Sequence, residues 1–237
     1  MAKKTKIAVF GASREPATPR IFGLSWSSKE KVLAEKLGAE FGGRFGNHIE
    51  ILTGACIGVP DLVANEARRY GVRITGYSGT TTLQEHLDNP NYASPDNFDE
   101  LKFLEPDEIR LNGLIERSLE MIKDADALVY LGGRTGTLGE FAMAYDGSDK
   151  PMYILLGANG EIDRFLAKGM RKQRKQGKIE LATEPIKLVS QIGYDFNIDG
   201  FRAKQPVRVI PKNATVSPIG WTAFAYPNPA ERIELAH

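Results

Sequence analysis

The sequence predicts an α/β protein with a doubly wound parallel sheet and helices on both faces. Short apolar runs of strand length alternate with stretches in which apolar residues recur at the period of a helix, the pattern of consecutive βα units. Glycines follow the first, second and fourth apolar runs, where strands of such a sheet turn into helices. With 237 residues, 42% of them hydrophobic, the chain is long enough to bury one substantial core.

The first half of the chain supplies three of the expected strands, over residues 6–10, 49–53 and 72–77. A helix is expected from Ser28, where residues 27–30 read as a capping box and Leu33, Leu37 and Phe41 form the inner stripe. A second helix is expected over residues 59–70, because Pro60 suits the first turn of a helix.

The second half continues the alternation. Helices are expected over residues 107–123, 137–145 and 162–175, and strands over residues 127–131 and 152–156. The apolar face of the helix at 107–123 is expected to consist of Leu111, Leu114, Ile115, Leu119 and Ile122.

Residues 78–106 form a long polar stretch after the third strand, on the side of the sheet where ligands bind. Stretches of this length are either functional or inert insertions. We expect a lid in which Leu83, Leu87, Tyr92 and Phe98 close over a ligand, and an inert surface insertion is the alternative.

Two regions follow from this pattern: a nucleotide-binding domain over residues 1–177 and an irregular extension over residues 178–237. Five prolines punctuate the extension around one expected strand at residues 207–210. We expect the extension to pack on the domain or on a partner chain, since Trp221, Phe224 and Tyr226 would be unfavourable in water.

Composition narrows the class of protein. Lysine and arginine number 31 against 30 acidic residues, a net charge of +1, so an anionic ligand must be held by local groups. A basic run from Lys168 to Lys178 is read as a solvated helix face rather than a nucleic-acid contact, because no aromatic residue interleaves it. Cys56 is the single cysteine, and the first apolar run is too short for a signal peptide or a membrane span. We therefore expect a cytoplasmic protein with neither a membrane nor a nucleic-acid partner.

Three glycine-rich turns are expected to meet where the winding of the sheet reverses, the place where open α/β sheets bind ligands. They are residues 11–13, 53–58 and 132–137. The last two open helices, whose N–H groups and positive dipole end suit a phosphate. The glycines of any single loop could equally serve a tight turn, but three converging loops favour a nucleotide or sugar-phosphate site. The candidate binding residues are Gly11, Ser13, Thr53, Gly54, Gly58, Gly133, Arg134, Thr135, Gly136 and Thr137.

Several familiar sites are absent from the sequence. There is no G-x-x-x-x-G-K-[ST] loop and no G-x-G-x-x-G after the first strand, and the second strand ends in Thr53 rather than in an acid for a ribose. The three histidines are scattered and no carboxylate cluster has metal-ligand spacing. We expect no cofactor and no metal.

Arg117 and Glu140 are the candidate catalytic pair. Glu140 belongs to a capping-box pattern that begins at Thr137, so it could simply cap the helix, but it points away from the expected apolar face and toward the ligand side. Arg117 flanks the apolar stripe of its own helix and could equally reach out to solvent.

These residues together resemble the Lonely Guy family of nucleoside 5′-monophosphate phosphoribohydrolases, once mislabelled as lysine decarboxylases. The resemblance rests on Arg117-Ser-Leu-Glu-Met121, on Leu131-Gly-Gly-Arg-Thr-Gly-Thr-Leu-Gly-Glu140 and on the loops after the first two strands, and it covers roughly residues 6 to 157. The spacing from Arg117 to Glu140 matches the family signature. Arg134 stands where the family has a glycine, Ser118 where it has a lysine, and Gly139 where it has an acid.

The resemblance implies a Rossmann-like fold, a homodimer or higher homo-oligomer, and hydrolysis of the N-glycosidic bond of a nucleoside 5′-monophosphate. Glu140 would stabilise the positive charge of the ribose ring and orient water, while Arg117 would orient Glu140. The alternative is a non-catalytic nucleotide-binding or sensor protein of the same fold, with the C-terminal extension as its output surface.

Overall fold

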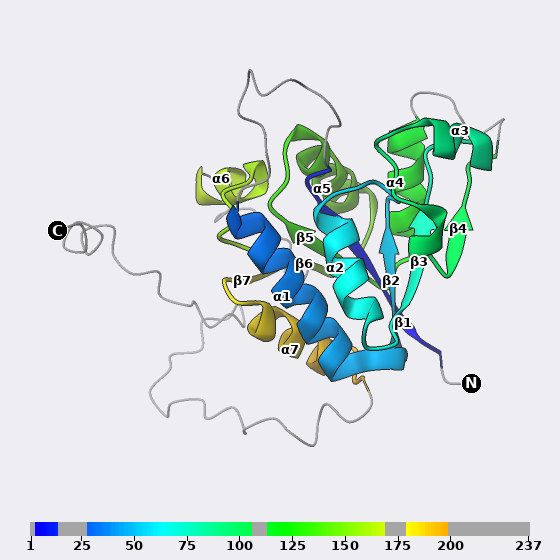
Figure 1. The fold of residues 1–237 in the computed structure, drawn as a ribbon. Helices are drawn as coiled ribbons and strands as arrows, with labels where there is room; N and C mark the ends of the chain where they lie inside the picture. Colours follow the sequence, from blue (N-terminus) through cyan, green and yellow to red (C-terminus); the bar gives the residue numbers. More distant parts are fainter. Residues whose placement is uncertain (1–2, 14–27, 106–112, 169–178, 199–237) are drawn as a thin grey trace, which may run out of the picture. The chain divides into compact units, whose positions relative to one another are not determined.

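The described part of the chain folds into a seven-stranded parallel sheet flanked by helices (Figure 1). The computed structural model describes residues 3–13, 28–105, 113–168 and 179–198. The strand order is β4-β3-β2-β1-β5-β6-β7, with every neighbouring pair parallel. The strands are β1 (Thr5–Gly11), β2 (Ile49–Thr53), β3 (Arg73–Tyr77), β4 (Glu100–Lys102), β5 (Ala127–Leu131), β6 (Met152–Leu155) and β7 (Ile179–Ala182).

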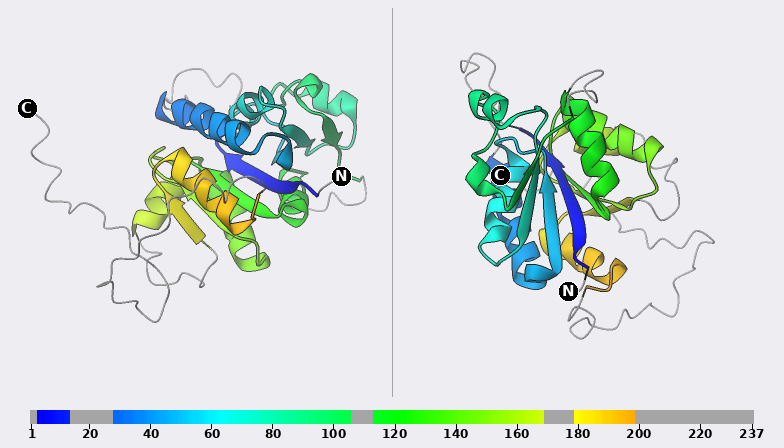
Figure 2. Two further views of the ribbon diagram at one scale, coloured as in Figure 1. Left: turned by 90° about the horizontal axis from the view of Figure 1, so that it is seen from below. Right: turned by 90° about the vertical axis from the view of Figure 1, so that its right-hand side faces the viewer.

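Helices cover both faces of the sheet (Figure 2). One face carries α1 (Ser28–Phe45), α2 (Val59–Arg68) and α7 (Pro185–Asp195), and the other carries α4 (Gly113–Asp124), α5 (Thr135–Gly147) and α6 (Glu161–Lys168). The short elements are α3 (Leu83–Asp88) and the 3-10 turns η2 (Gly46–His48) and η3 (Pro95–Asn97). The predicted α/β class with a doubly wound parallel sheet is confirmed. No helix in the described ranges is both long and apolar enough to cross a membrane.

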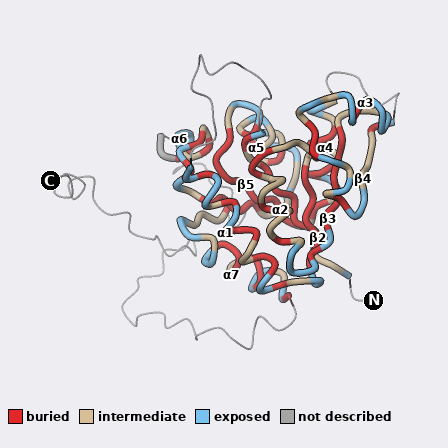
Figure 3. Tube along the Cα trace, viewed as in Figure 1, coloured by how far each residue is buried: buried red, intermediate tan, exposed pale blue. Residues whose placement is uncertain are grey.

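The core lies in two layers, one on each side of the sheet. Figure 3 shows the buried residues gathered in the interior of the fold. Side chains of a strand alternate between faces, so Ile7 and Val9 of β1 pack under α1 and α2 while Ala8 and Phe10 pack under α4 and α5. All residues of β2, β5 and β6 are buried, as expected for central strands of a parallel sheet with both faces covered.

The winding of the sheet reverses between β1 and β5, which are neighbours although β2, β3 and β4 come between them in the chain. This is the reversal that the sequence predicted, and it brings the ends of β1, β2 and β5 to one edge. The observed sheet is wider than the predicted one, because β4 and β7 extend it on both sides.

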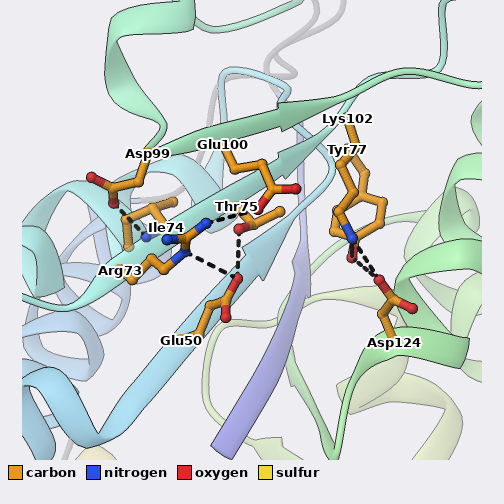
Figure 4. Close-up of polar contacts among 9 residues, drawn as sticks. All are labelled: Glu50, Arg73, Ile74, Thr75, Tyr77, Asp99, Glu100, Lys102 and Asp124. Atoms are coloured by element: carbon orange, nitrogen blue, oxygen red, sulfur yellow. Dashed lines mark hydrogen bonds and ion pairs between the residues drawn. The ribbon is translucent and has the colours of Figure 1, made fainter. Parts of the chain in front are cut away.

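Residues 78–105 are built into the edge of the sheet. Figure 4 shows β4 tied to its neighbour: Asp99 Oδ2 accepts a hydrogen bond from the Ile74 N–H at 2.8 Å, and Arg73 donates to Glu100 at 2.8 Å. Beside them, Lys102 donates to Tyr77 Oη at 3.0 Å and to Asp124 of α4 at 2.7 Å.

The expectation that Tyr92 and Phe98 close over a ligand is wrong, because both rings are buried in the core. The Phe98 ring packs against Gly76 of β3, and the Tyr92 ring stacks on His86 at 4.6 Å. Leu83 and Leu87 remain exposed on α3.

The sheet also takes in the start of the expected extension. Residues 179–198 form β7 and α7, and Leu188, Val189 and Ile192 of α7 are buried against the sheet. The ordered fold therefore continues past residue 177. The expected strand at 207–210, the aromatic residues of the tail and most of the basic run at 168–178 lie outside the described residues.

Candidate functional site

The three glycine-rich loops surround one cavity at the edge where the winding reverses. A bridge between Ser13 and Gly58 joins the first loop to the second, and the Val59 N–H donates to Ala12 O at 2.8 Å. The cavity has a volume of about 510 Å³. Nine of the predicted site residues line it: Gly11, Ser13, Gly54, Arg117, Arg134, Thr135, Gly136, Thr137 and Glu140.

Three predicted binding residues take other places. Thr53 is buried at the end of β2, where its hydroxyl accepts from the Ala55 N–H at 3.2 Å. Gly58 lies behind the cavity as the N-cap of α2. The Gly133 N–H donates to the Glu30 carboxylate at 3.3 Å, so that donor already has an anionic partner inside the protein.

Gly133 has a structural requirement of its own. Its φ of +85° is the left-handed conformation that favours glycine, and a Cβ there would meet the Thr137 side chain at 2.4 Å. The turn before α5 therefore depends on this glycine for its shape, whereas Thr135 and Gly136 present the first N–H groups of the helix to the cavity.

Arg117 is held by the second loop. It comes from α4, is only 8% exposed, and its Nη1 donates to Gly54 O at 2.8 Å and to Cys56 Sγ at 3.1 Å. A Cβ at Gly54 would lie 2.7 Å from the guanidinium carbon, so the second loop can approach Arg117 only because residue 54 is glycine. A buried cation needs such partners, since losing its water without them is costly.

Glu140 comes from the first turns of α5 and lies beside Arg117. Its Oε1 is 3.7 Å from Arg117 Nη2 and 2.8 Å from Ser118 Oγ. Burial raises the pKa of the Glu140 carboxyl, while Arg117 and Ser118 act in the opposite direction. The structure thus brings Arg117 and Glu140, the pair proposed from the sequence, together at the cavity wall.

Tyr130 of β5 is fully buried near Glu140. Its ring stacks on Phe10 at 4.9 Å and meets Phe141 edge-on at 5.5 Å. Burial, with the Glu140 charge nearby, raises the pKa of the Tyr130 phenol well above its ordinary value. The phenol is therefore neutral at any physiological pH.

The orientation of α4 differs from the prediction. Leu114, Ile115 and Leu119 are exposed by 38–48%, and the buried face consists of Arg117, Ser118, Met121 and Ile122. The physical reason is that the helix turns its polar edge toward the cavity, where Gly54 and Cys56 contact Arg117 and Glu140 contacts Ser118. Of the residues that apolar periodicity placed inside, Ile122 is buried, whereas Leu114, Ile115 and Leu119 are exposed. Leu111 lies outside the described residues.

Three residues of the site were not among the predicted ones. Ser118 contacts Glu140, Cys56 contacts Arg117, and Glu30 contacts the loop before α5. Ser118 and Cys56 could have been found, because each is close in sequence to a predicted site residue. Glu30 gave no such signal, because it acts across 103 positions of chain. Over the ranges that the structure describes, no group of three or more His, Cys, Asp or Glu residues could hold a metal ion.

Comparison with known proteins identifies the family to which this architecture belongs. The model of the SLOG cluster4 family matches residues 4–189. The chain belongs to the SLOG cluster4 family. This assignment confirms the resemblance to Lonely Guy proteins at the level of their Rossmann-like nucleotide-binding superfamily. No curated protein sequence matches the chain.

Solved structures show the same fold as this SLOG protein. The structural-genomics target TM1055 is 22% identical with a TM-score of 0.60, covering 81% of this chain and 99% of its own. The molybdenum cofactor binding protein from Rippkaea orientalis is 19% identical with a TM-score of 0.58, covering 83% and 99%. DNA processing protein A from Helicobacter pylori, which binds single-stranded DNA, is 14% identical with a TM-score of 0.54, covering 81% of each chain.

Proposed function

We propose that the cavity binds a nucleoside 5′-monophosphate and that the protein hydrolyses its N-glycosidic bond, giving free base and ribose 5-phosphate. The observation that supports this most is the Arg117–Glu140 pair, with its 3.7 Å contact, on the wall of a cavity that also receives the N-terminus of α5. The start of α5 suits the phosphate of a nucleotide. The Glu140 carboxylate, on another side of the cavity, suits its ribose and glycosidic bond.

The phosphate is assigned to the start of α5. The Leu138 N–H is the first to bond back along the helix, to Arg134 O at 2.9 Å, so the N–H groups of residues 135–137 are the donors directed at an anion. The Gly133 N–H does not serve as a phosphate donor, because it already donates to Glu30. Arg134 adds a positive charge to the same wall.

The chemistry is assigned to Glu140. Cleavage of an N-glycosidic bond develops positive charge on the ribose ring, and a carboxylate beside C1′ stabilises that charge and orients water. Glu140 Oε2 has no hydrogen-bond partner among the described residues, so this oxygen can serve substrate or water. Arg117 keeps the carboxylate in place.

A second candidate function is nucleotide or cofactor binding without chemistry. It is favoured by Arg134, a bulky side chain in the loop before α5, and by the fold shared with a protein described as binding the molybdenum cofactor. In that function the Arg117–Glu140 contact only shapes the wall of the cavity.

The test is base release from a panel of nucleoside monophosphates, followed by chromatography. Glu140→Gln should lower turnover on the order of a hundredfold, because a carboxylate that acts in the transition state is lost. Glu120→Gln is the control, since Glu120 is an α4 carboxylate that pairs with Lys123 outside the cavity. Calorimetric binding by the parent without any base release would favour the second function, and equal rates for Glu140→Gln and the parent would remove Glu140 from the chemistry.

A further inference from the structure

Ser118 presents one hydroxyl to two acceptors. Its Oγ lies 2.9 Å from Leu114 O, one turn back in α4, and 2.8 Å from Glu140 Oε1. Ser118 is only 1% exposed, so its hydroxyl depends on these two protein acceptors rather than on bulk solvent. A serine hydroxyl has a single proton to donate and lone pairs to accept with. It can therefore donate to only one of these two oxygens at a time.

When Glu140 is ionised, the hydroxyl must donate to the carboxylate. Two oxygens at 2.8 Å repel each other unless a proton lies between them, and the ionised carboxylate has none to give. Leu114 O loses little in this state, because a carbonyl inside a helix also accepts the N–H four residues ahead.

When Glu140 is protonated, the same three atoms remain paired in the opposite sense. The carboxylic acid donates to Ser118 Oγ, and the serine proton turns to Leu114 O, the bond back to the preceding turn that helical serines commonly form. Both protonation states of Glu140 are thus satisfied without movement of a heavy atom.

The groups around Glu140 do not restrict it to a single protonation state. Arg117 of α4 is the cation that faces it, at 3.7 Å, but the guanidinium also bonds to Gly54 O and to Cys56 Sγ. Tyr130 of β5 faces it as a neutral phenol, and Arg134 lies on the same cavity wall. Burial raises the pKa of Glu140 against the effect of Arg117, so the protonated state is accessible.

We propose that Ser118 is a positioning residue that lets Glu140 take a proton from the attacking water and return it to the departing base. The inference rests on the proposed hydrolysis. The water oxygen forms a bond to C1′ as one of its protons passes to Glu140. The C1′–N bond breaks, its electron pair goes to the base nitrogen, and Glu140 donates the proton to that base. The products are ribose 5-phosphate and the neutral base, and Glu140 is again a carboxylate.

The test compares the pH profile of kcat for the parent, Ser118→Ala and Ser118→Thr. Alanine removes a bond from both states of Glu140, so we expect the maximum of the profile to fall about tenfold or more with little change in KM. Threonine keeps the hydroxyl and should restore the rate to within about threefold of the parent.

A serine that only stabilised the carboxylate would behave differently. Its loss would move the acidic limb to higher pH, because the ionised form alone would lose a bond, but the maximum would stay near that of the parent. A maximum that does not fall would overturn the proposal, as would a threonine variant as slow as the alanine variant.

A second measurement separates this proposal from the proposed function. The Glu140 carboxyl can be titrated by carbon-13 NMR in the three proteins, with Glu140→Gln to assign the signal. If the parent releases no base, the hydrolytic function fails, and the titration still judges the contact between Ser118 and Glu140. Because the hydroxyl lowers the Glu140 pKa, this pKa should rise in Ser118→Ala and return toward the parent value in Ser118→Thr. An unchanged pKa in Ser118→Ala would mean that the hydroxyl does not donate to the carboxylate, and it would overturn the proposal.

Discussion

At the scale of single residues, the contacts of the buried Arg117 guanidinium determine how the site is arranged. Arg117 is nearly as buried as the core around it, and the structure meets its charge with Gly54 O, Cys56 Sγ and Glu140. The sequence predicted the Arg117–Glu140 pair because Glu140 follows the start of a helix at the crevice and because the spacing between the two residues resembles that of the Lonely Guy family. The contact from Glu30 to Gly133 could not be predicted, since no local pattern connects residues 103 positions apart.

The raised pKa of Glu140 predicts a pH-dependent cost of folding. Because burial raises the folded-state pKa of this carboxyl above its unfolded value, its neutral form is favoured in the fold. Its contribution to stability is therefore fully present below the unfolded pKa and is lost as pH rises through the folded pKa. Glu140→Gln has no such charge, so the stability of the parent relative to this variant should fall as pH rises above about pH 4.

Urea unfolding of both proteins across that range is the measurement. Glu120→Gln is again the control, and its stability relative to the parent should not follow this trend, because Glu120 lies on the outer side of α4 with a lysine partner. A parent that gains stability over Glu140→Gln as pH rises would mean that Arg117 outweighs burial.

At the scale of elements, α5 packs on the sheet and begins at the candidate phosphate site. Gly136 lies in its first turn and lines the cavity, and a Cβ built there meets nothing within 4 Å. A side chain at this position therefore projects into the cavity without disturbing the packing.

Gly136→Val should abolish nucleoside monophosphate binding while the protein still unfolds cooperatively, because a branched side chain would cover the N–H groups at the start of α5. Gly147→Val is the matched control, since Gly147 is in the same helix, has equal space around it and does not line the cavity. Calorimetry gives the affinities. Unchanged binding by Gly136→Val would remove this helix start from the phosphate site.

The elements also show where sequence reasoning failed. The long central strands were predicted to within a residue or two, because both of their faces are apolar. β4 and β7 were missed because they are short edge strands that are not buried along their whole length, so neither reads as a continuous apolar run. The prediction for α4 was right for Ile122 and wrong for Leu114, Ile115 and Leu119. These three are exposed because the buried face also holds Arg117 and Ser118, whose partners come from other elements.

At the scale of the whole molecule, the exposed apolar stripe of α4 agrees with the expected self-association. Leu114, Ile115 and Leu119 are 48%, 38% and 39% exposed, and the first two also line the cavity. Grouped apolar side chains at the rim of a ligand site are typical of an interface. A second copy seated on α4 would shield both this stripe and the mouth of the cavity from water.

We therefore expect a homodimer or higher homo-oligomer that depends on α4. Leu119→Asp places a charge in the stripe without touching the core, so light scattering at micromolar concentration should show a smaller mass than for the parent. Ile186→Asp is the control, because Ile186 of α7 is equally exposed at 41% but lies on the opposite face of the sheet. Its mass should equal that of the parent. A parent with the mass of a monomer contradicts self-association, and an oligomer that survives Leu119→Asp but dissociates with Ile186→Asp moves the interface to the other face.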